Sequence, residues 1–157
     1  SFLENKMMTR DSTIREYNVG QAVVHPWHLD QFGHMNVRWY AHFFDDAALQ
    51  FLALLRLSGG NGAVSHCVTA RATTSFSAEV LAGTCICILG SIAKIGTKSV
   101  TLEFRMIEVL SARNYAHCET VEVFVDAQTH QSIEIPSEIR CWLEESRFLD
   151  EARGDTK

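Results

Sequence analysis

The residues best suited to do chemistry fall in one short stretch, His25 to Asn36. It holds one carboxylate, Asp30, and leads directly into a long apolar segment typical of a helix. A helix start offers unpaired N–H groups and a partial positive charge, which bind anions and stabilise a developing oxyanion. We therefore predict that Asp30 reaches a substrate held there, in the ionised form that a base or nucleophile needs.

Other interpretations of this stretch stay open. An Asp close to a helix start commonly caps the helix or forms a turn, and His34 and Asn36 are equally suited to hydrogen bonds within a loop. Four histidines, His25, His28, His34 and His42, raise the question of a metal site. No pair of them has i, i+4 spacing on a clearly helical face and carboxylate partners are missing, so we expect no metal.

The element that must position Asp30 is the most apolar segment of the chain, Met35 to Leu57. Its main polar residues lie on one narrow stripe, because they follow at three- or four-residue steps: Arg38, His42, Asp45 and Asp46. The rest is apolar almost all round, which predicts a helix buried on most sides. The glycine-rich run from Ser58 to Gly62 should end it.

Alternating patterns predict strands before and after this helix. The expected strands are Tyr17 to His25, Ala63 to Phe76, a strand including Cys85 to Leu89, Thr97 to Leu110, a strand including Val121 to Val125, and Glu138 to Leu143. Short turns join the later ones, so the sheet should be mainly antiparallel. The prediction is an α+β fold whose sheet curls around one helix. No second helix is expected over the outer face, which a second copy of the chain would cover. The tail from Glu144 should be frayed or a short helix.

Length and charge narrow the function. The chain has 157 residues, typical of one domain spanning 1–157, with a core from about 15 to 145 and charged tails. The net charge is −5, from 14 Lys and Arg against 19 Asp and Glu, which argues against a nucleic-acid partner. No apolar run approaches the roughly 20 residues that span a bilayer, and no signal peptide is visible, so we expect a cytoplasmic protein without membrane contact. The five cysteines include no C-x-x-C pair and predict buried, reduced thiols.

One series of residues resembles a known family. Asp30-x-x-Gly33-His34-Met35-Asn36, then Trp39-Tyr40 and Phe43-Phe44-Asp45-Asp46-Ala47, resembles the hotdog-fold acyl-CoA thioesterases, most of all the 4-hydroxybenzoyl-CoA thioesterase group. Weaker matches follow at Ser75-Phe76, Leu81 to Thr84 and Ile95 to Val100, so the resemblance covers most of residues 17–143. It implies the hotdog fold, a long central helix wrapped by a five- or six-stranded antiparallel sheet. The periodicity predicts the same arrangement.

The resemblance also implies an activity, hydrolysis of an acyl-CoA thioester without a further cofactor. Asp30 would be the nucleophile or the base that activates water. Backbone N–H groups around His34 to Val37 would polarise the thioester carbonyl, and Gly33, His34 and Asn36 would complete the site. The family implies a homodimer or homotetramer with its sites at the dimer interface. The lead-in His25-Pro26-Trp27-His28 and Phe32 depart from the family pattern, which leaves the acyl group open.

Coenzyme A brings several negative charges to an acidic chain, so a local basic patch is required. The candidate is the turn at Lys94, Gly96, Thr97, Lys98 and Ser99, although an ordinary solvated hairpin would look the same. Phe32, Trp39 and Tyr40 are the aromatic candidates for substrate contact.

Two other functions remain. One is the hydration or dehydration of an enoyl thioester by a hotdog-fold enzyme, with His34 and Asp45 as a catalytic pair formed across the dimer, although Asp45 and Asp46 are expected to be structural. The other is binding of an acyl-CoA without turnover. The Asp30 series favours hydrolysis.

Overall fold

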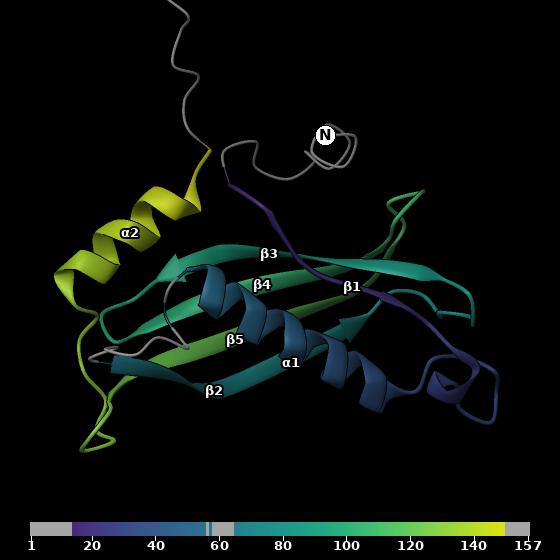
Figure 1. The fold of residues 1–157 in the computed structure, drawn as a ribbon, viewed down its shortest axis with the longest axis horizontal. Helices are drawn as coiled ribbons and strands as arrows, with labels where there is room; N and C mark the ends of the chain where they lie inside the picture. Colours follow the sequence, from purple (N-terminus) through teal and green to yellow (C-terminus); the bar gives the residue numbers. More distant parts are fainter. Residues whose placement is uncertain (1–13, 56, 58–64, 150–157) are drawn as a thin grey trace, which may run out of the picture.

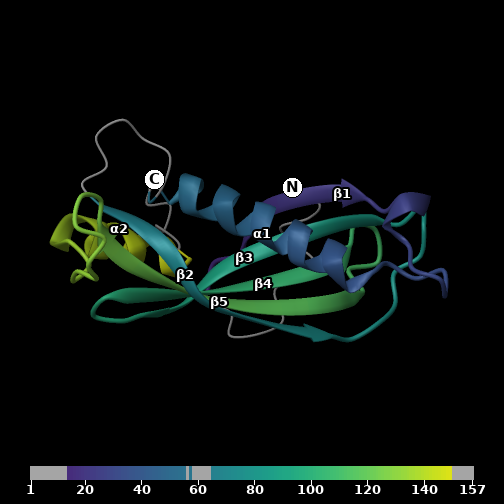
Figure 2. The same ribbon diagram turned by 90° about the horizontal axis from the view of Figure 1, so that it is seen from below.

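The computed structural model describes residues 14–55, 57 and 65–149. Along the chain it contains β1 (Tyr17–Val23), the short 3-10 helix η1 (Pro26–His28), α1 (Val37–Leu54), β2 (Ser65–Phe76), β3 (Cys85–Ile95), β4 (Ser99–Glu108), β5 (Asn114–Asp126) and α2 (Ser137–Arg147). All strand pairs are antiparallel, and the five strands form one sheet in the order β1-β3-β4-β5-β2. The sheet curves around α1, which crosses its concave face (Figure 1 and Figure 2). The predicted α+β architecture is confirmed.

The central helix buries one face only. Its buried residues recur at helical spacing: Tyr40, Phe44, Ala47, Ala48, Phe51 and Leu52. They pack on β1, β3 and β4, and the approach is closest at Gly90, where an added Cβ would lie 2.9 Å from the Phe51 ring. The opposite face of α1 is exposed and carries the predicted polar stripe together with Val37 and Leu49. Burial on most sides is therefore wrong for the single chain.

The predicted strand at Glu138 to Leu143 is wrong, because these residues form most of α2. Ile139, Cys141 and Leu143 alternate as residues of a strand would, yet Cys141 is exposed. Burial instead follows Ile139, Leu143 and Ser146, which is the i, i+4, i+7 spacing of a helix.

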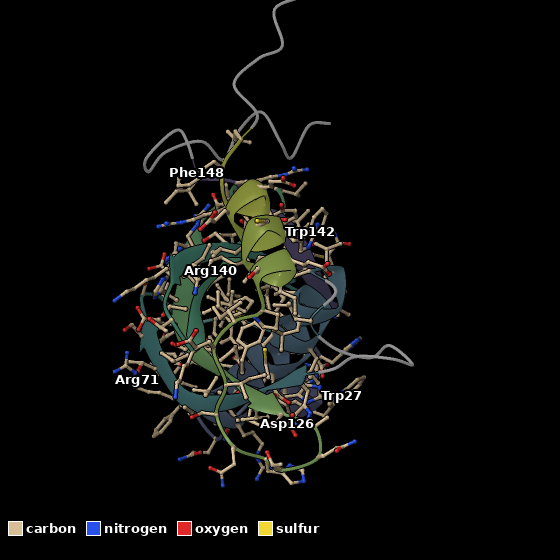
Figure 3. The ribbon with its side chains drawn as sticks, turned by 90° about the vertical axis from the view of Figure 1, so that its left-hand side faces the viewer. Trp27, Arg71, Asp126, Arg140, Trp142 and Phe148 are labelled. Atoms are coloured by element: carbon tan, nitrogen blue, oxygen red, sulfur yellow. The ribbon has the colours of Figure 1, made fainter. Side chains whose placement is uncertain are left out.

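Helix α2 closes one end of the core rather than covering the outer face of the sheet. Arg140 Nη2 donates to the carbonyl oxygen of Gly96 at 2.7 Å, and Tyr17 Oη donates to the carbonyl oxygen of Ser146 at 2.7 Å. Figure 3 looks onto this end, with Arg140 and Trp142 on opposite sides of the helix.

The outer face of the sheet carries ion pairs and a small buried apolar cluster of Cys87, Leu89 and Ile107. Arg105 forms two hydrogen bonds of 2.9 Å with the carboxylate of Glu16, and Arg71 Nη2 lies 3.1 Å from Glu119 Oε1. Among the described residues no helix lies over these pairs. The expected second copy over this face is not tested by a single chain.

All five cysteines are free, but only part of the prediction for them is correct. Cys87 and Cys118 are buried and Cys67 is half-buried, whereas Cys85 and Cys141 are exposed. Cys85 lies at the first position of β3, where the sheet ends, and Cys141 lies on the outward side of α2. Burial of every thiol is therefore wrong.

Candidate active site

Asp30 holds together the loop that precedes α1. Its Oδ1 accepts hydrogen bonds from the N–H groups of Phe32 (2.8 Å) and His34 (3.3 Å), while its own N–H donates to the His34 carbonyl oxygen at 2.8 Å. Gly33 completes the turn with φ of +79°, a left-handed conformation that glycine adopts without strain. Oδ2 of Asp30 receives no hydrogen bond from any residue that the structure describes. The side chain thus forms the predicted turn and still presents one free carboxylate oxygen.

Most of the predicted oxyanion donors are already engaged. The N–H of His34 donates to Asp30 Oδ1, that of Met35 to the Val80 carbonyl oxygen (2.8 Å), and that of Asn36 to the His28 carbonyl oxygen (2.8 Å). Val37, the first residue of α1, is the one member of this set whose N–H has no acceptor within the described part of the chain. The available donor at the helix start is therefore this single N–H group.

Asn36 is the N-cap of α1. Its Oδ1 accepts a hydrogen bond from the Arg38 N–H at 3.0 Å, and its carbonyl oxygen accepts one from the Trp39 N–H at 2.9 Å. These bonds satisfy donors of the first turn and fix where the helix begins. The cap sets the position of the Val37 N–H relative to the Asp30 loop.

The segment that follows β2 forms the other wall. His34 Nε2 lies 3.0 Å from Glu79 Oε2, and the rings of Tyr40 and Phe76 meet edge to face at 5.0 Å. Burial, and then the nearby Glu79, raise the pKa of Tyr40 above its ordinary value. Sequence reasoning missed Glu79, because nothing local marks a residue that long-range pairing brings to the site. His34 is paired with Glu79, while Asp45 lies more than two helical turns along α1; the pairing needed for hydration is not formed in one chain.

The unusual lead-in packs as an aromatic cluster beside the helix start. His28 is buried, its ring lies 4.5 Å from that of Trp39, and its Nδ1 accepts a hydrogen bond from the His25 N–H at 2.9 Å. Burial chiefly, and then the neighbouring His25 and His42, lower the pKa of His28. His28 is therefore neutral at pH 7, with its proton on Nε2.

The three other histidines of the candidate metal set make different contacts. His25 stacks on Trp27 at 4.1 Å, His42 Nε2 lies 3.4 Å from Asp46 Oδ2, and His34 turns to Glu79. Within the described ranges, no three His, Cys, Asp or Glu side chains come together as metal ligands.

The aromatic substrate candidates lie at different depths. Phe32 is 72% exposed at the tip of the Asp30 loop, Trp39 is half-buried against His28, and Tyr40 belongs to the core. Only Phe32 and Trp39 are therefore open to a ligand that approaches the helix start.

A groove of about 480 Å³ runs along the exposed side of α1, above β2 and β5. Its walls include Arg38, Asp45 and Ala48 from the helix and Thr69, Ala72 and Thr120 from the strands. It begins in the first turn of α1, at Arg38, so it extends the site beyond the Asp30 loop.

The predicted coenzyme A hairpin lies at the opposite end of the molecule. Lys94, near the end of β3, and Lys98, in the β3–β4 turn, are exposed. This turn contacts α2, whereas Asp30 lies beyond the other end of α1 (Figure 1). An 18-residue helix is about 27 Å long, which separates the two regions within one chain. Sequence order gave no indication of this separation.

A helix crossing the concave face of a curved antiparallel sheet defines the hotdog class of folds. Similar solved structures include YbaW, a probable thioesterase from Escherichia coli (TM-score 0.70, 18% identity, 83% of this chain and 99% of that one). Slr0204 from Synechocystis, a 1,4-dihydroxy-2-naphthoyl-CoA thioesterase, has a TM-score of 0.68 at 15% identity over 85% and 96%. BH1999, a gentisyl-coenzyme A thioesterase, has a TM-score of 0.64 at 23% identity, over 80% of this chain and 99% of that one. No protein with a curated description matches the sequence significantly.

A sequence model of the thioesterase-like superfamily matches residues 24–143. The chain belongs to this superfamily, and its class of enzyme is thioester hydrolase. Neither described helix is long and apolar enough to cross a membrane.

Proposed function

We propose that the protein hydrolyses an acyl-CoA thioester to a free carboxylic acid and CoA, with Asp30 as the attacking or activating group. The observation that carries this proposal is the arrangement at the start of α1. Two backbone N–H groups hold Oδ1 of Asp30. Among the described residues, Oδ2 of Asp30 and the Val37 N–H at the adjoining helix terminus have no hydrogen-bond partner. A fixed carboxylate beside a positive helix end is suited to nucleophilic or general-base chemistry.

Either role of Asp30 balances chemically. As a base, Oδ2 takes a proton from water while the water oxygen attacks the thioester carbon; the C–S bond then breaks and CoA leaves as a thiolate that is protonated. As a nucleophile, Oδ2 attacks the carbon directly, CoA leaves, and water hydrolyses the resulting anhydride. In both routes the carbonyl oxygen gains negative charge, and the Val37 N–H and the helix dipole stabilise it.

We further propose a homodimer in which a second copy supplies the basic patch. Strand β2 is twelve residues long and has no neighbour on its far side within the described part of the chain. Antiparallel pairing of two β2 strands would place the α2 end of one copy beside the Asp30 end of the other. The second copy's hairpin with Lys94 and Lys98 would then approach the coenzyme A phosphates. The free thiols are consistent with the cytoplasm.

The activity is tested with acyl-CoAs of graded length and aromaticity, scored by loss of the thioester. Thioester loss with at least one acyl group, abolished in Asp30→Asn, supports the proposal. Tight binding of acyl-CoA without turnover would instead identify a binding module.

The shared site is tested by co-expressing two differently tagged variants, Asp30→Asn and Lys94→Ala/Lys98→Ala, and purifying the mixed dimer. If sites combine Asp30 of one copy with the lysines of the other, one fully intact site forms and activity at low substrate concentration exceeds that of both parents. If each site lies within one chain, no intact site forms and activity stays at parental level.

A further inference from the structure

Two buried polar atoms, one at the groove and one beneath it, have no hydrogen-bond partner among the described residues. Glu122 is 1% exposed and Thr120 is 4% exposed, and both lie on the concave side of β5. Neither Oε1 of Glu122 nor Oγ1 of Thr120 has a hydrogen-bond partner in the described part of the chain. Buried polar atoms are nearly always paired, so two orphaned atoms two residues apart need an explanation.

The carboxylate of Glu122 is held in one orientation. Glu122 pairs with Thr69 across the β2–β5 ladder, and Thr69 Oγ1 donates to Glu122 Oε2 at 2.8 Å. Oε2 is thereby satisfied, and Oε1 remains as an acceptor that lacks a donor. Thr69 and Thr120 both line the groove, so this polar group lies directly beneath it.

The rest of the groove has a polar part, formed by the exposed Arg38, His42 and Asp45 of α1, and an apolar part that suits an acyl chain. Small or apolar side chains form the apolar part, among them Ala41, Phe44 and Ala48 from α1 and Ala72 from β2. A ligand that lies along these residues meets its first orphaned hydrogen-bonding group at Thr120.

The distance of Thr120 and Glu122 from the Asp30 end of the molecule determines which part of a bound ligand can reach them. Tyr40, one turn into α1, contacts Phe76, which pairs with Ala116 of β5. Thr120 lies four residues further along β5, or about 13 Å, and Glu122 lies about 20 Å along. A ligand whose thioester is at the helix start would therefore bring a distant atom, not its first carbons, to Thr120 and Glu122.

We propose that this groove binds the far end of an elongated acyl group that carries a hydrogen-bond donor, a hydroxyl or an amine, which Thr120 and Glu122 receive. The inference rests on the proposed function for the position of the thioester. It assigns to Thr120 and Glu122 the selection of a polar-ended acyl chain over its apolar parent.

Binding of non-hydrolysable S-alkyl-CoA thioethers tests the proposal without relying on turnover. Titration calorimetry compares hexyl, octyl, decyl and dodecyl chains, each as the parent and with a terminal hydroxyl or amine. We expect wild-type protein to bind one donor-bearing ligand about tenfold or more tighter than its parent, at one chain length. Preference for the amine or for the hydroxyl identifies the donor.

Thr120→Val keeps the size of the side chain and removes only an unpaired hydroxyl, so it should fold as well as wild type. We expect it to lose most of the preference, with affinity for the parent chain unchanged. Glu122→Gln should weaken amine binding most, and a thermal melt verifies that it folds. Thr73→Val, on the same strand pair but facing the outside, should leave the preference intact.

Equal affinity for parent and donor-bearing ligands at every length, or an unchanged preference in Thr120→Val, overturns the inference. If the protein prefers donor-bearing ligands but hydrolyses no acyl-CoA, the role of the groove is supported and the proposed hydrolysis is refuted. Hydrolysis without a binding preference supports the proposed function and overturns the role of the groove. The groove would then be a surface that a second copy of the chain covers.

Discussion

Replacing Asp30 by Asn or by Ala separates the turn role of this residue from a catalytic one. The Asn amide oxygen can still accept from the Phe32 and His34 N–H groups, so the loop is kept while the charge and the nucleophilic oxygen are lost. Alanine removes both hydrogen bonds as well. Comparing the two variants therefore isolates each contribution of the side chain.

The magnitudes follow from these two bonds. The 2.8 Å bond to Phe32 is charge-assisted, the 3.3 Å bond to His34 is long and weak, and the carboxylate is half-exposed. We expect Asp30→Ala to lose about 1–2 kcal/mol of unfolding free energy, and Asp30→Asn about 0.5 kcal/mol. For a domain of this size that corresponds to a fall in Tm of roughly 3–6 °C and 1–2 °C. Both variants should lose a factor of about 10² to 10⁴ in kcat.

Turnover is best followed by the absorbance of the thioester bond. A thiol reagent would also react with the exposed Cys85 and Cys141 and would obscure slow rates. An Asp30→Asn variant that retains more than about a tenth of wild-type kcat would refute the catalytic role and leave Asp30 as a turn residue.

Three further predictions concern packing, pH and thiols. Gly90→Ala should cost about 1–3 kcal/mol by urea unfolding, because its Cβ would lie 2.9 Å from the buried Phe51 ring; adding Phe51→Leu should cost less than the two single changes summed, and additive losses would contradict this packing. The folded state lowers the pKa of His28, so the unfolded state binds more protons; stability should be complete above about pH 6.5 and fall as pH drops toward the lowered pKa, with a shallower fall in His28→Asn. An equally steep fall in that variant would assign the effect to other groups. A thiol reagent should modify Cys85 and Cys141 of the native protein rapidly, whereas Cys67, whose pKa is raised to about 12 by burial and then by Glu122, should react only on unfolding. Rapid native reaction at Cys67 would show that the part of β2 around Cys67 opens in the folded protein.

The strands were predictable where one face meets the core and the other meets solvent. Val100, Leu102, Phe104 and Met106 are fully buried and alternate with partly exposed residues, so period-two alternation was present in the sequence. The sequence does not distinguish α2 from a strand, because Ile139, Cys141 and Leu143 also alternate. The burial of Ser146 and the exposure of Cys141 distinguish the helical period from the period of two in a strand. Both depend on tertiary packing.

The candidate site was predictable only where it is local. Asp30, Gly33 and Asn36 lie in one loop, so their spacing alone brought them together. Glu79 joins them through the pairing of Met35 with Val80, which no short-range pattern encodes. Lys98 illustrates the opposite case. Lys98 and Asp30 are both predicted from the sequence to contact one substrate, yet within one chain the β3–β4 hairpin and the Asp30 loop lie at opposite ends of the sheet.

The strand order of the sheet has a consequence for the order of folding. Strands β3, β4 and β5 form consecutive hairpins. By contrast, β1 and β2 pair with strands that are distant in the sequence: Tyr17 pairs with Gly90, and Ser65 with Asp126. On the ribosome, α1 emerges with its apolar face before any strand of that meander exists to cover it. The apolar face of α1 is therefore buried only when the meander of β3, β4 and β5 forms. Docking of the two edge strands should be the slow part of folding, because it requires loop closure over these long separations.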